Sequence, residues 1–118
     1  MSRIPAARWV TRAELEPQLE VAREAIVSKL SQALTNYHLA CLANLSEDHF
    51  VRLFRATYGV APAKYRSIMR MRRAKELVNQ GLRASQAARE LGYRSLPTFS
   101  RMYRQAHGAS PTKGNSAE

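Results

Sequence analysis

Apolar residues recur at helical spacing along most of the chain. Between positions 19 and 33 they follow one another at intervals of three or four residues, as Leu19, Ala22, Ile26, Leu30 and Ala33. This spacing predicts an amphipathic helix over residues 17–34, with Pro17 in the first turn, where a backbone N–H has no helical partner. The preceding "TRAE" at 11–14 is typical of a capping box. No stretch alternates apolar and polar residues over a strand's length, so the pattern predicts an all-α fold.

Five further helices are predicted from cap residues, glycines and periodicity. The expected segments are 37–44, capped by Thr35 or Asn36; 47–58, capped by Ser46; 63–80, with Pro62 in the first turn; 83–91; and 96–107, capped by Ser95. The segment 63–80 would span about 27 Å. Its narrow apolar stripe, surrounded by basic residues, predicts one bound side and one solvent-exposed side. The stripe is Ile68, Met71, Ala74, Leu77 and Val78, and the basic residues are Arg66, Arg70, Arg72, Arg73 and Lys75.

Two segments of the chain repeat each other at an offset of 49 residues. The matched positions are Ser46 with Ser95, Phe50 with Phe99, Arg52 with Arg101, Arg55 with Arg104, Gly59 with Gly108 and Pro62 with Pro111. Each segment holds a short helix, a turn and a serine-capped second helix, which is the order of a helix-turn-helix. The prediction is therefore two small helix-turn-helix bundles, a homeodomain-like pair, joined by a long linker helix. The expected divisions are an arm or linker at 1–17, subdomains at 18–61 and 81–113, the linker helix at 62–80 and a tail at 114–118.

In the second helix of each repeat, aromatic residues are expected inside and arginines outside. The inward positions are Phe50, Leu53, Phe54 and Thr57 in the first copy, and Phe99, Met102, Tyr103 and Ala106 in the second. The outward positions are Asp48, Val51, Arg52 and Arg55, and Pro97, Ser100, Arg101 and Arg104. In a major groove such arginines can bind guanine with two hydrogen bonds. The same spacing also fits an amphipathic helix used twice for packing alone.

The charge of the chain favours a polyanionic partner. The 118 residues include 19 Lys and Arg against 9 Asp and Glu, a formal net charge of +10. Residues 36–118 hold 14 of the basic residues and 5 of the acidic ones, so the excess accompanies the repeats. Such a bias is typical of nucleic-acid binding. An anionic membrane fits less well, because no stretch combines a basic face with a bulky apolar face. A basic module that binds RNA or an acidic protein without reading sequence stays an alternative.

Two longer motifs resemble those of AraC/XylS-type transcription regulators. "YRSIMRMRRAKELV" at 65–78 resembles their linker helix, and "ARELGYRSLPTFSRMYRQAHGASP" at 88–111 resembles their signature around the second helix-turn-helix. The likeness covers about residues 19–113. It implies a sequence-specific double-stranded DNA-binding domain that touches adjacent major grooves of a bacterial promoter. It also implies regulation of transcription through RNA polymerase, with activation expected and repression left open as the alternative.

Carried over by position, the resemblance assigns base contacts to residues of both repeats. They are Asp48, His49, Val51 and Arg52 in the first, and Leu96, Pro97, Thr98, Ser100 and Arg101 in the second. Side-chain chemistry then predicts the arginines at guanine, Asp48 at a cytosine amino group, and Val51 and Pro97 at thymine methyl groups. Phosphate contacts, which supply affinity without direct sequence information, are expected from Arg55, Lys64, Arg94 and Arg104.

The sequence departs from the family's usual residues at a few positions. Ala84 and Ala87 replace larger aliphatic residues, Arg66 replaces an apolar one, and Gly114-Asn115 replaces an aromatic-Arg ending. We therefore expect the second bundle to be loosely packed. Because Leu96 and Pro97 are apolar, base readout is expected to lie mainly in the first repeat.

No enzyme active site, cofactor site or small-molecule effector site is predicted. His38, Cys41 and His49 lack the spacing of a structural zinc site. His107 aligns with Tyr58 of the first repeat, which favours a packing or surface role over catalysis. There is no phosphate-binding glycine loop and no local nucleophile–base pair. Without a membrane-length apolar run or a signal peptide, we expect a cytoplasmic, nucleoid-associated protein. The target sequence, the oligomeric state and whether the chain is part of a larger regulator stay open.

Overall fold

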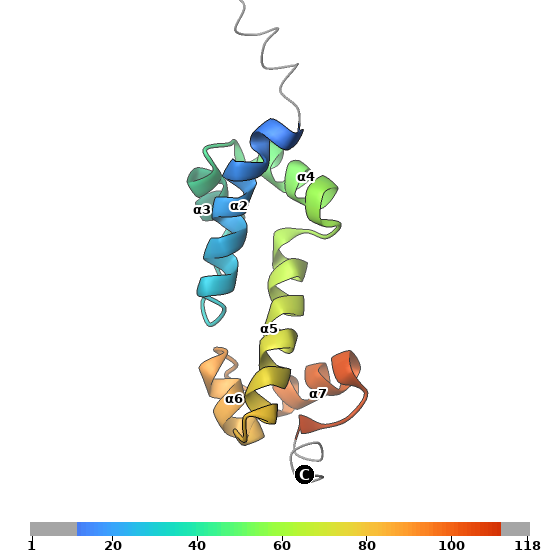
Figure 1. Ribbon diagram of the computed structural model, residues 1–118. Helices are drawn as coiled ribbons and strands as arrows, with labels where there is room; N and C mark the ends of the chain where they lie inside the picture. Colours follow the sequence, from blue (N-terminus) through green and yellow to red (C-terminus); the bar gives the residue numbers. More distant parts are fainter. Residues whose placement is uncertain (1–11, 112–118) are drawn as a thin grey trace, which may run out of the picture. The chain divides into compact units, whose positions relative to one another are not determined.

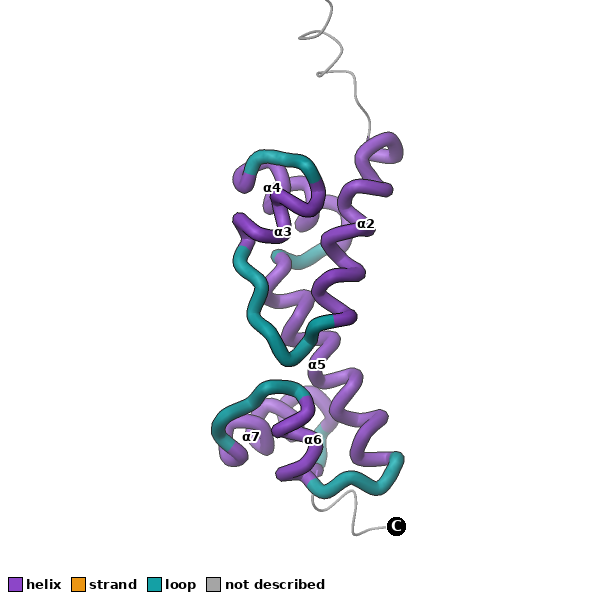
Figure 2. Tube along the Cα trace, turned by 90° about the vertical axis from the view of Figure 1, so that its left-hand side faces the viewer, coloured by secondary structure: helices purple, strands orange, loops and turns teal. Residues whose placement is uncertain are grey.

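The computed structural model describes residues 12–111 of the chain. In this part the chain folds into six α-helices (Figure 1). They are α2 (Arg12–Ser28), α3 (Asn36–Ala43), α4 (Glu47–Tyr58), α5 (Pro62–Asn79), α6 (Ala84–Glu90) and α7 (Leu96–His107). No β-strand occurs among the described residues, which confirms the all-α prediction (Figure 2). The predicted cap Thr11, the tail at 114–118 and the Gly114-Asn115 ending lie outside the described residues.

The first compact unit comprises residues 12–28 and 34–65 of the described chain. It holds α2, α3, α4 and the first turn of α5, and α2 packs against both α3 and α4. Phe50 and Phe54 of α4 are fully buried, and the ring centroid of Phe54 lies 4.6 Å from that of Tyr58 and 5.5 Å from that of Tyr65. The other buried residues of this core are Leu19, Ala22, Ile26, Leu39, Ala40 and Ala43. Burial of each large apolar side chain stabilises the unit by about 1.5–3 kcal/mol.

The second compact unit comprises residues 29–33 and 66–111. It holds the rest of α5 together with α6 and α7. Phe99 and Tyr103 of α7 are buried, at the repeat positions of Phe50 and Phe54. The buried core of this unit is Met71, Ala74, Leu77, Val78, Ala84, Ala87, Ala88, Leu91, Phe99 and Tyr103. Both alanines that replace larger family residues are thus core residues, and the looseness predicted from them stays a prediction.

The helix ends agree with the caps that the sequence predicts. Thr35, Ser46 and Ser95 are the N-caps of α3, α4 and α7, and each hydroxyl oxygen accepts a hydrogen bond from the backbone N–H three residues later. The N···O distances are 3.0, 3.2 and 3.2 Å. Gly59 and Gly108 end α4 and α7 with φ of 86° and 80°, a conformation that residues with a Cβ rarely adopt. The second helices of the two repeats, α4 and α7, therefore both begin at a serine cap and end at a glycine.

The prediction of one helix over residues 17–34 is wrong at both ends. The helix begins at Arg12, so Pro17 lies inside it rather than in its first turn, and it ends at Ser28. The following residues fold onto the second unit, where Leu30 packs against the core and its carbonyl oxygen accepts a hydrogen bond of 2.9 Å from Arg66 Nη2. Ala33, predicted to face inward, is exposed. Contacts distant in sequence therefore override the helical spacing.

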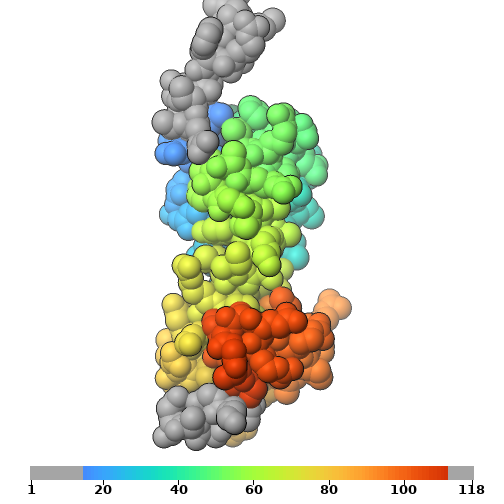
Figure 3. All heavy atoms as spheres, turned by 90° about the vertical axis from the view of Figure 1, so that its right-hand side faces the viewer, coloured from blue at the N-terminus to red at the C-terminus, as the bar shows by residue number. Residues whose placement is uncertain are grey.

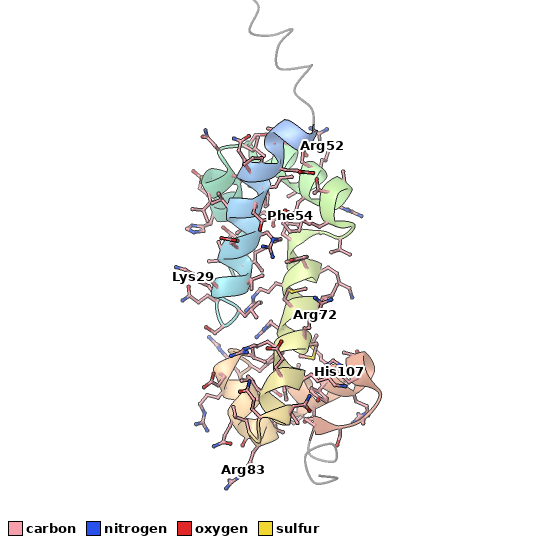
Figure 4. The ribbon with its side chains drawn as sticks, in the orientation of Figure 1. Lys29, Arg52, Phe54, Arg72, Arg83 and His107 are labelled. Carbon is pink, nitrogen blue, oxygen red and sulfur yellow. The ribbon has the colours of Figure 1, made fainter. Side chains whose placement is uncertain are left out.

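Two further positions predicted to face a core are exposed. Ile68 is 38% exposed, whereas Arg66 and Arg70, two positions to either side of it on α5, are half-buried. Ala106 is exposed, and the residue after it, His107, is half-buried in the last turn of α7. A ring nitrogen of His107 lies 2.8 Å from the carbonyl oxygen of Met71 in α5 (Figure 4).

Candidate nucleic-acid interface

Helix α4 presents a polar face on the side opposite its buried aromatic residues. Phe50 and Phe54 fix the inner face, and Figure 4 labels Phe54 and Arg52 on this helix. Asp48, His49 and Arg52 are exposed, and Val51 between them is half-buried. These are the residues predicted to contact bases, and they lie on one helix whose start is fixed by the Ser46 cap.

Asp48 and Arg52 form an ion pair on this exposed face. Asp48 Oδ2 accepts a hydrogen bond of 3.2 Å from Arg52 Nε and also lies 3.2 Å from Arg52 Nη2. The side chains are 85% and 70% exposed, respectively. The residues are four apart, with the acid nearer the N-terminus of the helix, which is the favourable order for such a pair. Two of the predicted base-contacting residues are therefore joined to each other in the free protein.

Helix α7 has the same construction with different residues at its start. Ser95 caps it, Leu96 is 42% exposed, and Pro97 and Arg101 are also exposed. Thr98 and Ser100 are half-buried. Figure 3 shows α4 in green and α7 in red, each at the surface of its own unit. Arg101 forms no ion pair within the described residues, because Pro97 stands where α4 has Asp48.

The residues predicted to contact phosphates are all exposed. Arg55 and Arg104 lie in the last turns of α4 and α7, Lys64 lies in the first turn of α5, and Arg94 lies in the turn before Ser95. None of the four side chains takes part in an ion pair within the described residues. Their positive charges are therefore available to an anionic partner.

A family model described as "Helix-turn-helix domain" matches residues 39–114 of the chain. The crystal structure of a transcriptional regulator from Chromobacterium violaceum, of the AraC-type DNA-binding-domain proteins, is similar with a TM-score of 0.78 and 27% identity. The similarity covers 88% of this chain and 94% of that one. The chain belongs to the AraC-type helix-turn-helix family.

Two further relatives of this AraC-type chain are informative. The DNA-binding domain of the global transcriptional factor AdpA, solved in complex with a target DNA, has a TM-score of 0.75 and 25% identity, over 84% of this chain and 90% of that one. The probable transcriptional regulator LumQ from Photobacterium leiognathi is 30% identical over 89 residues, which are 75% of this chain and 36% of LumQ. The chain spans about a third or less of the length of the curated relatives it matches.

In the first unit of this AraC-type chain, a polar network holds the end of α4 against α2. Arg23 Nε donates to both carboxylate oxygens of Glu20 at 3.0 Å, and Arg23 Nη1 donates to the Tyr65 hydroxyl at 3.3 Å. The Tyr58 hydroxyl, in the last turn of α4, donates to Glu20 Oε1 at 3.3 Å. The hydrogen bond from Arg23 lowers the pKa of Glu20, and burial raises the pKa of Tyr58. The network therefore helps to set the direction of α4.

In the second unit, Arg70 of α5 contacts the turn that precedes α7. Arg70 Nε and Nη2 both donate to the Leu91 carbonyl oxygen, at 3.2 and 2.7 Å, and its guanidinium carbon lies 3.8 Å from the centre of the Tyr93 ring. Gly92 in this turn has φ of 83°, and a Cβ there would lie 2.4 Å from the Ser31 carbonyl oxygen. Burial lowers the pKa of Arg70 and raises that of Tyr93. The turn therefore lies between Arg70, which donates to it, and the backbone of Ser31, which leaves no room for a side chain at Gly92.

The sequence predicts Arg66 and Arg70 only as basic residues around the apolar stripe of α5, and does not predict that they donate to backbone carbonyls. A signal was present, because Arg66 and Arg70 lie four residues apart beside the stripe and one of them replaces a usual apolar residue of the family. Their backbone partners, the carbonyls of Leu30 and Leu91, are distant in sequence and carry no side-chain signature.

Between residues 12 and 111 there is no group of three His, Cys, Asp or Glu side chains placed to hold a metal ion. None of the described helices is both long and apolar enough to cross a membrane. His107 packs against α5 and the Tyr103 ring, as its alignment with a tyrosine predicted.

Proposed function

We propose that this chain acts as a sequence-specific double-stranded DNA-binding transcription regulator, with α4 and α7 as its recognition helices. The observation that carries the proposal is the duplicated helix-turn-helix, in which a serine-capped helix buries two aromatic residues and exposes an arginine on the opposite face. An α-helix of this kind fits the major groove of B-DNA, where base edges can be distinguished.

The proposed base contacts differ between the two helices. Arg52 and Arg101 are assigned to guanine, and Val51 and Pro97 to thymine methyl groups. The other residues assigned to bases are His49, Leu96, Thr98 and Ser100, and Asp48, which the sequence also assigns to a base, is paired with Arg52. Because the start of α7 exposes apolar Leu96 and Pro97, most of the discrimination among sequences is assigned to α4.

The proposed phosphate contacts supply most of the affinity. Arg55, Lys64, Arg94 and Arg104 are exposed, and the chain has a formal net charge of +10. Each phosphate neutralised releases counterions from DNA, so binding should weaken steeply as salt rises. This dependence alone does not separate specific from non-specific binding, because both rest on it.

The proposal extends to transcription because relatives of this family carry that description. LumQ is named a probable transcriptional regulator, and AdpA a global transcriptional factor. In the bacterial setting that these relatives support, the chain would act on a promoter, as an activator that contacts RNA polymerase, and would be found with the nucleoid. No enzymatic activity is proposed, since the family is one of DNA-binding regulators.

The experiment first selects bound sequences from random double-stranded DNA. If both helices read adjacent major grooves, a bipartite motif should emerge whose halves lie about one helical turn, roughly 10 base pairs, apart. Arg52→Ala should then cost roughly 1–3 kcal/mol on the selected site and much less on random DNA. Equal losses on both would favour the alternative, a basic module that binds nucleic acid without reading its sequence.

A further inference from the structure

The ion pair on α4 suggests a role for Asp48 other than the base contact predicted from the sequence. We propose that Asp48 is a positioning residue, which holds the guanidinium group of Arg52 in the orientation that reads guanine. This inference rests on the proposed function. It assigns no direct base contact to Asp48 and makes the specificity of Arg52 depend on a second side chain.

The contact geometry leaves the useful edge of the guanidinium group free. Asp48 Oδ2 lies 3.2 Å from both Nε and Nη2 of Arg52, so the carboxylate occupies the edge formed by these two nitrogens. The Nη1 hydrogens and the second hydrogen of Nη2 stay available. These form the pair of parallel donors that matches the O6 and N7 acceptors of guanine in the major groove. One edge is therefore held by the protein, and the other is presented outward.

Among residues 12–111, the hydrogen bond and ion pair that Arg52 forms are both with Asp48. Its side chain is 70% exposed, and its one ion pair within the described residues is the pair with Asp48. A free arginine loses rotational freedom when it docks on a base, and a side chain that is already oriented loses less. Placement of the acid in the first turn of α4 is itself favourable, because a negative charge there interacts well with the helix dipole.

The second helix provides an internal contrast. Arg101 occupies the repeat position of Arg52, but its residue four positions earlier is Pro97, which cannot hold a guanidinium group. Arg101 also forms no ion pair within the described residues. The two arginines thus share a place in the repeat, and only Arg52 is oriented by a carboxylate. This difference predicts that Arg52 discriminates bases more sharply than Arg101.

The test measures binding to a DNA site selected by the wild-type chain and to every single-base variant of that site. Arg52→Ala is expected to lose roughly 5- to 150-fold discrimination at one base pair. Asp48→Ala should lose roughly 1.4- to fivefold discrimination at the same base pair, and should cause no further loss when combined with Arg52→Ala. Asp48→Glu, which keeps a carboxylate four residues before Arg52, should retain most of it. Because Asp48→Ala removes a negative charge, affinity for random DNA should rise at the same time.

Glu47→Gln is the matched control, because Glu47 precedes Asp48 in the first turn of α4 and forms no ion pair within the described residues. It should raise affinity for random DNA in the same way and leave the base profile unchanged. In the reverse direction, Pro97→Asp should sharpen discrimination at the base pair read by Arg101. That gain should vanish in the Pro97→Asp, Arg101→Ala double variant.

The role of Asp48 is overturned if Asp48→Ala changes preference at a base pair that Arg52→Ala leaves unchanged, which is the result expected for a direct cytosine contact. It is equally overturned if Asp48→Ala and Glu47→Gln give the same base profile. A wild-type chain that does not discriminate among the variants would overturn the proposed function and the role of Asp48 together. The wild-type profile therefore distinguishes the two failures.

Discussion

Arg70→Ala should destabilise the second unit without touching the exposed face of α7. The guanidinium group of Arg70 donates two hydrogen bonds to the Leu91 carbonyl oxygen, at 3.2 and 2.7 Å, and lies 3.8 Å from the centre of the Tyr93 ring. Leu91 is the last residue before the Gly92 turn that leads to α7, and it is 3% exposed. The substitution removes the donor for a largely buried carbonyl and one neighbour of the ring.

The magnitude follows from these two contacts. Leaving a buried acceptor without its donor costs about 1–3 kcal/mol, and loss of a partly desolvated cation–π contact costs about 0.5–2 kcal/mol. Relief of the desolvation that lowers the pKa of Arg70 offsets a part of this. We therefore expect a loss of about 2–3 kcal/mol in the free energy of unfolding, or roughly 10–20 °C in Tm for a domain of this size.

Thermal and urea unfolding measure the loss, and amide hydrogen exchange locates it. Arg72→Ala is the control, since Arg72 lies exposed on the same helix (Figure 4) and should change stability by no more than about 0.5 kcal/mol. Amides of α6 and α7 should lose more protection in Arg70→Ala than amides of α3 and α4. If Arg70→Ala unfolds with the same Tm as Arg72→Ala, the argument that Arg70 holds the turn is refuted.

Three other predictions concern separate features. Gly92→Ala should cost at least about 1–2 kcal/mol of stability, because the residue has positive φ and its new Cβ would approach the Ser31 carbonyl oxygen to 2.4 Å. A urea unfolding curve that coincides with that of the wild-type chain would contradict this. Arg104→Ala should weaken binding to selected and random DNA alike, and should reduce the slope of the logarithm of the DNA-binding constant against the logarithm of the salt concentration by about 1. An unchanged slope would contradict the phosphate contact proposed for Arg104. The hydrogen bond from Arg23 lowers the pKa of Glu20 in the folded chain below 4.5, its ordinary value in the unfolded chain. Ionised Glu20 therefore stabilises the first unit fully above pH 4.5, and this stabilisation is lost as the pH falls through the pKa of the folded state. Glu20→Gln should therefore flatten the fall in stability of the first unit between about pH 6 and pH 3, by about 0.2–1 kcal/mol, and a parallel pH profile would contradict this.

The features that sequence predicts well in this chain are local ones. Ser46 and Ser95 are predictable as caps because a capping hydroxyl accepts from an N–H in the first turn of its own helix, and the spacing of Phe50 and Phe54 fixes the inner face of α4 within a single helix. Gly59 was predicted as a helix end for the same reason, because the left-handed conformation is a property of one residue. The recognition-helix candidates could therefore be derived almost completely from the sequence.

The features that sequence missed depend on contacts between distant residues. The helical spacing of Leu30 continues beyond Ser28, but the chain leaves the helix there because Leu30 packs on the second unit and its carbonyl oxygen binds Arg66. Arg70 reads as a surface residue of α5, since its partner is a backbone carbonyl 21 positions away. The Asp48–Arg52 pair has a recognisable spacing, but spacing alone does not tell whether each side chain reads a base or holds the other.

The most direct test of the central claim compares equilibrium affinities of the wild-type chain for its selected site and for random DNA of equal length, at physiological salt. A sequence-specific DNA-binding protein should bind the selected site about a thousandfold more tightly or better, with a strong salt dependence on both DNAs. An affinity ratio near one, with the same salt dependence, would contradict sequence-specific recognition by α4 and α7.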